Sequence, residues 1–502
     1  MKKNMLLSIV FVALCTSGML VYGQSTKKPS TAERTSVDIT IYNQNLSLVR
    51  EERKVTLPKG MSTVTVPDIP QTIDGTSVHF VSITDPEAVK VLEQNYQYDL
   101  VNQSKLLEKY IGKEVEFIRV NEETKKEYTV QGTILAKGDP AQNQWGMVSP
   151  ANSIIAEVNG KIEINPIGRL VLPSLPEGLI LKPQLQWLVN NTKEGSHKTE
   201  VSYLAGQLSW LCNYVVVLNK DNTKLDLTGW VTLTNNSGTT FKDAGLKLVA
   251  GDVNVVRDQF DGGLARGGMM MKTMSEAEPQ FKQSNLFEYK LYSLQRHTDL
   301  NDNETKQIEL TSGKNVESEK VFIYDGMDNQ WRYYLNSHDY RTQQSFGQQS
   351  NPKVGVYVTF KNETKSGLGI ALPKGKIRVY TKDEEGKEQF IGEDQIDHTP
   401  KDEEIRLYLG NAFDIVGERA QKDFKTFANG HVVEETIEIK VRNHKDEQVE
   451  VMIYEHPWRW SQWEIQNFDG IWEKVDQSTI KFPVKIKKDG EKKITYTIRY
   501  SW

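Results

Sequence analysis

The sequence predicts a mainly β protein made of tandem antiparallel β-sandwich modules of the immunoglobulin-like type, with a small SH3-like barrel inserted and one or two short helices. Two observations lead to this fold class. Apolar and polar residues alternate along most of the chain, and turn signals such as Pro-Lys-Gly, Asn-Gly and Asp-Gly separate the alternating runs. Strands with this pattern bury one face, as the strands of a sandwich do.

The first 23 residues have the pattern of a secretory signal peptide. Lys2 and Lys3 precede an apolar run over residues 5–14, and a small-residue site at 21–23 precedes Gln24. The apolar run is shorter than the roughly 20 residues of a spanning helix. We therefore expect cleavage after residue 23, no transmembrane span in the mature chain, and export to the periplasm, the cell surface or the medium.

Charge and cysteine content narrow the classes of partner and chemistry. Cleavage would remove Lys2 and Lys3 and no acidic residue, so the formal net charge would change from −5 to −7. An acidic protein binds polyanions poorly, which excludes nucleic acid as an expected partner. Lipid attachment at Cys15 requires a small residue directly before the cysteine, and this position is occupied by Leu14. No lipid anchor is therefore expected. Cys212, the remaining cysteine, has aromatic and apolar neighbours that predict a buried, inert thiol.

Four segments are expected after the signal peptide. Polar residues 24–36 predict a disordered tether. Residues 37–185 are expected to form an N-terminal β domain, residues 186–350 a first β-sandwich, and residues 351–502 a C-terminal β-sandwich.

The N-terminal domain begins with a strand in which Val37, Ile39 and Ile41 share one face. A hairpin with its turn at residues 58–60 comes next, because Gly60 can take a left-handed conformation there. A third short strand is predicted over residues 78–83.

A helix and a small barrel are predicted next. Apolar residues at three-and-four spacing over residues 106–111, followed by Gly112 as a left-handed cap, predict the helix. Alternating runs at 115–120, 128–135 and 154–158, with an Asn159-Gly160 turn, predict an SH3-like barrel at about 113–165.

The second half of the chain repeats one pattern three times. An alternating strand runs into an asparagine and a polar turn at Asn235, Asn362 and Asn443. An asparagine side chain can hydrogen-bond the backbone two residues further on and so mimic a turn. The unequal spacing of the three copies disfavours a solenoid or propeller, and the similar strand ends favour sandwich units.

The chain also resembles a known family over nearly its whole mature length. The segments that carry this resemblance are Tyr42 to Glu51, Leu106 to Lys113, Val201 to Tyr214, Leu227 to Gly238, Leu372 to Tyr380 and Ile396 to Gly410. They are similar to the bacterial domain-of-unknown-function 4139 family of exported β-rich proteins, which are related to mucoidy-inhibitor-like proteins. The resemblance implies an exported β-rich fold, and it implies no reaction and no catalytic residues.

The sequence contains no pattern that is diagnostic of catalysis, of a metal site or of a cofactor. There is no His-Glu-x-x-His, paired Cys-x-x-Cys or calcium-loop spacing, and no Gly-x-Ser-x-Gly elbow in a suitable context. His398 lies beside Asp397, but the following Thr399-Pro400 favours a structural turn. Carboxylates from separate strands could still meet in space, as they do in glycoside hydrolases.

Two segments are unusual in composition. Glycine and methionine residues over about 257–285 predict a mobile loop. Trp458, Trp460 and Trp463 are candidate ligand-binding residues, because exposed aromatic rings stack on sugar faces. In an extended segment Trp458 and Trp460 share a face while Arg459 points away. The alternative is that the rings fill a sheet interface or cover an edge, as their large apolar area favours.

These observations predict an exported, non-catalytic protein of the cell envelope that binds or organises another envelope component, either a protein or a glycan. One alternative is a hydrolase of polysaccharide or cell wall that uses carboxylates from separate strands. The other is a glycan-binding protein that uses Trp458 and Trp460.

Overall fold

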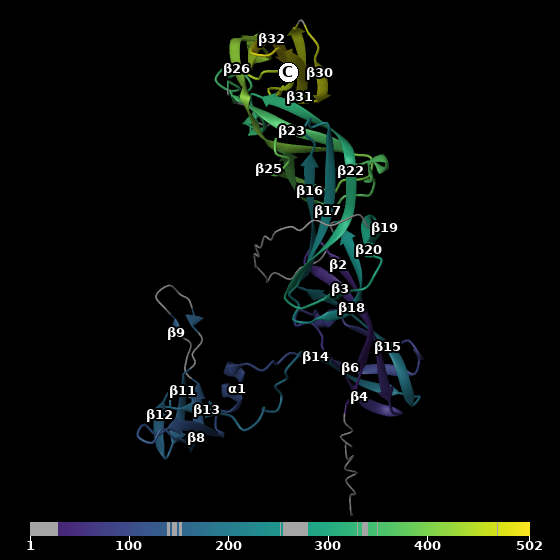
Figure 1. Cartoon of the computed structure of the whole chain (residues 1–502), viewed down its shortest axis with the longest axis vertical. Coiled ribbons are helices and arrows are strands. Elements are labelled where there is room, and N and C mark those ends of the chain that lie inside the picture. Colours follow the sequence, from purple (N-terminus) through teal and green to yellow (C-terminus); the bar gives the residue numbers. More distant parts are fainter. Residues whose placement is uncertain are drawn as a thin grey trace, which may run out of the picture. The chain divides into compact units, whose positions relative to one another are not determined.

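The computed structural model describes residues 29–502 except 138–140, 143–147, 150–152, 252, 255–279, 329, 334–339, 349 and 469. Strands dominate it (Figure 1), which confirms the mainly β fold class. The predicted signal peptide lies outside the described residues, as does the predicted Gly/Met-rich loop up to residue 279. Residues 281–285 of that loop form most of β19 (Phe281–Leu286), where Phe281 is buried and the backbone pairs with β20 (Tyr289–Leu294).

The chain forms two compact units, and each draws on several segments. The first consists of residues 1–34, 53–69 and 80–200, and the second of residues 35–52, 70–79 and 201–502. The elements toward the N-terminus are β1 (Ser30–Thr31), β2 (Glu33–Tyr42), β3 (Leu46–Leu57), β4 (Gly60–Pro67), η1 (Gly75–Ser77), β5 (His79–Ser82), β6 (Val89–Gln97), α1 (Gln103–Lys109), β14 (Gln184–Asn191) and β15 (Gly195–Gly206).

The segment predicted as a disordered tether is ordered from residue 30 onward. Strand β1 pairs in parallel with β4 in a four-stranded sheet of order β1-β4-β14-β6. Between β1 and β2, Ala32 is fully buried, and its carbonyl oxygen accepts a hydrogen bond of 2.9 Å from Nη1 of Arg53. The prediction was wrong because the hydrogen bonds between strands are made by the backbone. A polar strand at the edge of a sheet can therefore form without an alternating apolar pattern in its sequence.

The single α-helix of the described residues, α1, begins three residues before the predicted span. Asn102 caps it, since its Oδ1 accepts a hydrogen bond from the backbone N–H of Lys105. An antiparallel sheet of order β12-β11-β8-β7-β13 follows. Its strands are β7 (Glu114–Val120), β8 (Glu127–Lys137), β11 (Ile154–Val158), β12 (Lys161–Ile164) and β13 (Arg169–Val171), and β9 (Ala141–Gln142) pairs with β10 (Val148–Ser149) in a separate two-stranded antiparallel sheet.

The predicted Asn-Gly turn is confirmed in this sheet. Asn159 and Gly160 both have positive φ, 50° and 72°, and they join β11 to β12. Leu107 and Tyr110 pack with apolar residues of β7, β8 and β11 in one core. Closure of the sheet into an SH3-like barrel stays a prediction.

The second unit contains two sheets. The smaller runs in the order β19-β20-β18-β2-β3-β15-β5 with β21 paired to β18, and the larger follows the path β25-β24-β16-β17-β22-β23-β26-β27-β32-β29 with β28, β30 and β31 attached. The remaining elements are β16 (Leu208–Leu218), β17 (Lys224–Asn235), β18 (Phe241–Ala250), β21 (Thr298–Leu300), β22 (Glu304–Asp325), η2 (Gln330–Tyr333), β23 (Lys353–Lys361), η4 (Thr364–Ser366), β24 (Gly375–Lys382), β25 (Glu388–Ile396), β26 (Glu404–Phe427), η5 (Ala428–Gly430), β27 (Val432–Asn443), β28 (Val449–Glu455), β29 (Trp463–Asn467), β30 (Glu473–Asp476), β31 (Thr479–Ile486) and β32 (Gly490–Ser501).

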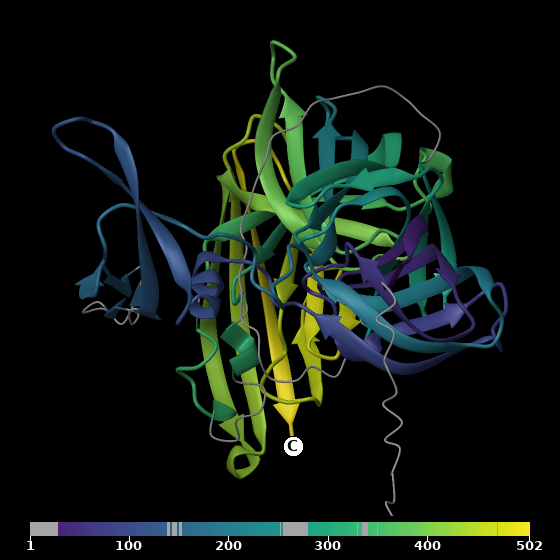
Figure 2. The same cartoon turned by 90° about the horizontal axis from the view of Figure 1, so that it is seen from below.

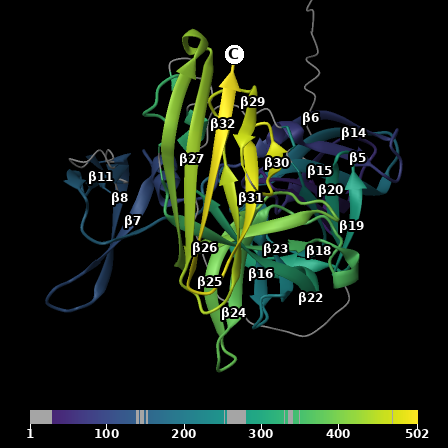
Figure 3. The same ribbon diagram turned by 90° about the horizontal axis from the view of Figure 1, so that it is seen from above.

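Two very long strands organise the larger sheet. Strand β22 has 22 residues and β26 has 24, and β23 pairs with both of them. Toward the C-terminus, β27 and β32 continue the sheet, as the green and yellow strands of Figures 2 and 3 show. One hydrogen-bonded sheet thus runs through both regions that were expected to be separate sandwiches. The division into two immunoglobulin-like sandwiches stays a prediction.

The three asparagines of the repeated pattern are buried and hold turns. Oδ1 of Asn235 accepts a hydrogen bond from the backbone N–H of Ser237, and Oδ1 of Asn443 accepts one from Lys445. These two contacts confirm the predicted bond to the backbone two residues on. Oδ1 of Asn362 instead accepts from the N–H of Gly369.

Candidate functional site

The tryptophan cluster does not form an open platform. Trp458 is 3% exposed and packs with Met327 and Trp331. Trp460 is half-buried against the C-terminal core, and the guanidinium carbon of Arg341 lies 3.8 Å from its ring centroid. A sugar therefore has no access to the faces of Trp458, which has the structural role that the alternative interpretation expected.

Trp463 lies on β29, the edge strand of the larger sheet. Its Nε1 donates a hydrogen bond of 2.8 Å to the carbonyl oxygen of Gln477, and its ring lies 6.3 Å from that of Trp472. The expected orientation of Arg459 was wrong. Residues 456–462 are not a strand, and Arg459 turns inward to 1% exposure.

A recess with aromatic and polar walls lies on one face of the larger sheet, and we call it the tyrosine cleft. Its volume is about 860 Å³. It lies where β22, β23, β26 and β28 run side by side. It is lined by Ile323, Asp325, Gly326, Met327, Asp328, Ser350, Asn351, Lys353, Gly355, Tyr357, Arg406, Tyr408, Asn411 and Tyr454.

Strand register explains why these residues meet. Gly355 of β23 pairs with Ile323 of β22 on one side and with Asn411 of β26 on the other, and Tyr357 pairs with Tyr408. Residues two apart on a strand face the same way, so the wall residues of each strand line one face. The cleft is thus assembled from strands that are distant in the sequence.

Gly355 forms part of the floor of the cleft. A Cβ at this position would lie 2.7 Å from Cε2 of Tyr357, which is closer than two carbon atoms that are not bonded to each other can approach. The Tyr357 ring therefore lies across the glycine. Glycine inside a strand weakens the ladder and often marks a place where another group approaches the backbone closely.

The two tyrosines form an angled aromatic pair. Their ring centroids are 5.2 Å apart with an interplanar angle of 49°, and the guanidinium carbon of Arg406 lies 5.6 Å from the Tyr357 ring. Tyr408 is 39% exposed, and its hydroxyl donates to Oδ1 of Asn411 at 3.1 Å. Burial raises the pKa of Tyr357, so its hydroxyl keeps its proton as a donor.

Asp325 lies at the end of the cleft away from Arg406, and hydrogen bonds hold its carboxylate in place. Its Oδ1 accepts hydrogen bonds from the backbone N–H groups of Met327 and Asp328, and its Oδ2 lies 3.0 Å from Nε2 of His456. The imidazole of His456 stacks on Trp331 at 4.4 Å and does not line the cleft. The carboxylate of Asp325 is therefore fixed in orientation, and its Oδ2, which has one partner, can accept a further hydrogen bond from a ligand hydroxyl.

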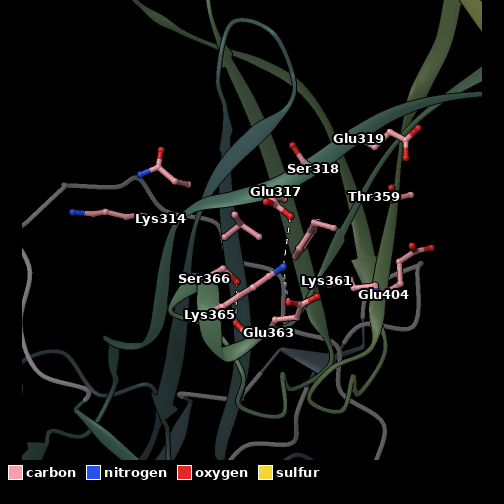
Figure 4. Close-up of a pocket in the computed structure, with 13 residues that line it drawn as sticks. Lys314, Glu317, Ser318, Glu319, Thr359, Lys361, Glu363, Lys365, Ser366 and Glu404 are labelled. Carbon is pink, nitrogen blue, oxygen red and sulfur yellow. Dashed lines mark hydrogen bonds and ion pairs between the residues drawn. The ribbon is translucent and has the colours of Figure 1, made fainter.

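A second recess, the glutamate groove, gathers carboxylates from separate strands. It has a volume of about 450 Å³, and its carboxylates are those of Glu317 and Glu319 of β22, Glu363 of the loop after β23, and Glu404 of β26 (Figure 4). Lys365 lies between Glu317 and Glu363, with Nζ 3.6 Å from Oε2 of Glu317 and 3.1 Å from Oε2 of Glu363. The hydrogen bond to Glu363 raises the pKa of Lys365. A charged lysine thus occupies the space that a substrate would need between these two carboxylates.

Other candidate groups for chemistry are closed off. Oγ of Ser82 lies 3.2 Å from Nδ1 of His197, but both residues are buried and line none of the recesses above. Cys212 is 1% exposed, and burial raises the pKa of its thiol to about 12. This confirms the buried thiol. Nδ1 of His398 accepts a hydrogen bond from the backbone N–H of Lys374, which fits the structural turn predicted there.

The described residues contain no group of three or more His, Cys, Asp or Glu side chains placed to hold a metal ion. None of the described helices has the length and apolar character needed to cross a membrane. No protein-family model matches the chain, and no curated protein matches it. The resemblance to the domain-of-unknown-function 4139 family therefore stays a prediction from the sequence.

Sequence reasoning missed the tyrosine cleft. Tyr357 and Tyr408 are separated by two strands and several turns, and only the pairing of β23 with β26 brings them together. One signal was present in the sequence. Gly355 interrupts the alternating run that ends at Asn362, and a glycine within such a run indicates a close approach.

Proposed function

We propose that this chain is an exported, non-catalytic binding protein of the cell envelope and that the tyrosine cleft is its ligand-binding surface. The observation that supports this proposal is the Tyr357–Tyr408 pair over Gly355, in which Tyr408 is exposed and Tyr357 is half-buried, with hydrogen-bonding side chains around it. Recesses of this size with a few converging polar groups are the usual form of ligand sites. The signal-peptide pattern supports the location.

The chemistry of the cleft supports binding over catalysis. The carboxylate of Asp325 is engaged by two backbone N–H groups and by His456, so it is not a free base. General acid–base catalysis needs a group that can exchange a proton with the substrate at hydrogen-bond distance. Among the described residues that line the cleft, Asp328 is the other carboxylate, and it lies exposed at the rim.

Affinity capture from envelope extract tests this function. The mature protein, Tyr408→Ala and Tyr128→Ala are immobilised in parallel. Tyr128 is a matched control, because it is an exposed tyrosine of the five-stranded sheet. We expect the wild type and Tyr128→Ala to retain the same envelope component and Tyr408→Ala to lose most of it. Equal capture by all three proteins, or none by any, contradicts the proposal.

A hydrolase that uses the glutamate groove is the second candidate, because this groove does bring glutamates from separate strands together. Lys365 between Glu317 and Glu363 argues against it. Incubation with purified cell-wall polysaccharide and measurement of new reducing ends decides the question. We expect no release above background. Release that disappears in Glu363→Gln would instead establish the hydrolase.

A further inference from the structure

We propose that the tyrosine cleft recognises an acidic sugar, a pyranose that carries a carboxylate, within a glycan. This inference rests on the binding function proposed above and adds the chemical class of the ligand. It follows from three features of the cleft: the tyrosine pair, the position of Arg406, and the carboxylates of Asp325 and Asp328 at the opposite end.

The aromatic pair suits a pyranose ring. A pyranose has a face of C–H bonds and a rim of hydroxyls, so it packs on an aromatic face and hydrogen-bonds sideways. Tyr408 offers an exposed ring, and Asn411 lies beside it with its Oδ1 in contact with the tyrosine hydroxyl. Large rigid rings with a polar tip are effective contact groups because little conformational freedom is lost on binding.

Arg406 supplies the charge selectivity. It is exposed on β26 next to the Tyr357 ring, and it forms no ion pair with any other residue that the structure describes. Its partner across the ladder is Thr359, so no acid faces it on β23. A guanidinium presents a planar fork of donors that matches a carboxylate with two parallel hydrogen bonds.

The charges are arranged along the cleft. Asp325 and Asp328 lie at the end of β22, with Lys353 at the start of β23, whereas Arg406 lies beyond the Tyr357–Tyr408 pair at the opposite end. At its end of the cleft Arg406 is the lining cation, so a ligand carboxylate pairs with its guanidinium there; Glu404, two residues away on β26, lines the glutamate groove and not the cleft. The carboxylates of Asp325 and Asp328 are placed to accept hydrogen bonds from hydroxyls. A neutral sugar would leave Arg406 without a partner.

Calorimetric titration of the mature protein tests the assignment. The probes are a trimer of galacturonic acid and the neutral trimer of galactose. We expect the acidic trimer to bind at least about tenfold more tightly than the neutral one, which corresponds to one charge-assisted contact. Arg406→Gln should remove this difference. Arg406→Lys should restore only part of it, because the ammonium keeps the charge and loses the fork.

The controls separate this inference from the binding function. Arg442→Gln, which replaces a partly exposed arginine of β27 outside the cleft, should bind both trimers as the wild type does. Equal affinity for the two trimers, or an unchanged affinity in Arg406→Gln, overturns the acidic-sugar assignment while the binding function stands. If neither trimer binds but Tyr408→Ala still loses the envelope component, the ligand class is wrong and the function is kept. If neither trimer nor any envelope component binds, both proposals fail.

Discussion

Arg419 and Glu455 form a two-pronged ion pair inside the C-terminal part of the protein. Nε and Nη2 of Arg419 donate to the two carboxylate oxygens of Glu455 at 2.8 and 3.0 Å, and the side chains are 4% and 1% exposed. The hydroxyl of Tyr496 also donates to Glu455. A buried pair of this geometry is costly to break, because removal of one partner leaves the other charge without compensation.

Glu455→Gln should therefore destabilise the protein by about 3–5 kcal/mol. Urea unfolding followed by circular dichroism measures the change. Glu418→Gln is the matched control, because Glu418 pairs with Arg442 at 3.2 Å where both side chains are substantially exposed. Its cost should be at most about 1 kcal/mol. Similar losses in the two variants would show that burial does not set the strength of these pairs.

Arg459 forms a second buried pair and also holds a segment, residues 340–348, which we call the strap. Its Nη2 donates to Oε1 of Glu435 at 2.7 Å. Its guanidinium also donates to four carbonyl oxygens of the strap, those of Tyr340, Arg341, Gln343 and Phe346. One side chain thus satisfies backbone acceptors that would otherwise be buried without partners.

Arg459→Lys should loosen the strap while leaving most of the fold in place. An ammonium has three donors and no fork, so it cannot reach the same carbonyls and Glu435 together. Limited proteolysis with mass spectrometry should show faster cleavage within residues 340–348, by roughly tenfold if about 1.4 kcal/mol of local stability is lost. Arg442→Lys, at an exposed pair, should be cleaved at the wild-type rate. Unchanged cleavage in Arg459→Lys would contradict the clamping role.

Strand positions were largely predictable, because each strand contributes a period-two pattern that is read locally. The buried charges also left a signal that the prediction did not use. On β27, Glu435 lies two residues after Val433 and two residues before Ile437, so its side chain faces the core as theirs do. Glu455 continues the inner face of β28 after Ile453 in the same way. A charged residue in phase with apolar neighbours is therefore a sign of a buried ion pair.

The tyrosine cleft could not be predicted in the same way. Its shape depends on which strands pair and in which register, and a shift of one residue would turn Tyr408 to the other face of the sheet. The tryptophans misled for a related reason. A shared face for Trp458 and Trp460 depends on an extended segment, whereas the segment leaves the sheet after Glu455 and Trp458 and Arg459 turn inward.

Asn235→Ala should cost more stability than substitution of its neighbour. Nδ2 of Asn235 donates to the carbonyl oxygens of Thr239, Leu300 and Asn301, and the residue is 3% exposed. Loss of the amide leaves buried backbone groups unsatisfied, which costs about 1–3 kcal/mol. Asn236→Ala, an adjacent exposed asparagine, should change stability by less than about 0.5 kcal/mol. Chemical unfolding of both variants provides the comparison, and equal losses would contradict a turn-holding role for the buried amide.

Glu438 should make the stability of the protein depend on acidity at low pH. It is 8% exposed and forms ion pairs with Lys422, Lys440 and Lys493. The hydrogen bond from Lys493, aided by Lys422, lowers the pKa of Glu438 to about 2. Because the pKa is lower in the folded state, the stabilisation is fully present above the ordinary value of 4.5 and is lost as the pH falls through about 2.

Thermal melts of the wild type and Glu438→Gln across pH 2–7 test this dependence. The difference in melting temperature should be constant above about pH 5.5, shrink as the pH falls below 4.5, and be smallest at pH 2, where Glu438 is protonated in the unfolded state and about half protonated in the folded state. Glu473→Gln, at a single exposed pair with Lys481, should give a smaller difference. A wild-type advantage that persists undiminished at pH 2 would mean that the lysines stabilise this site by packing and not by charge.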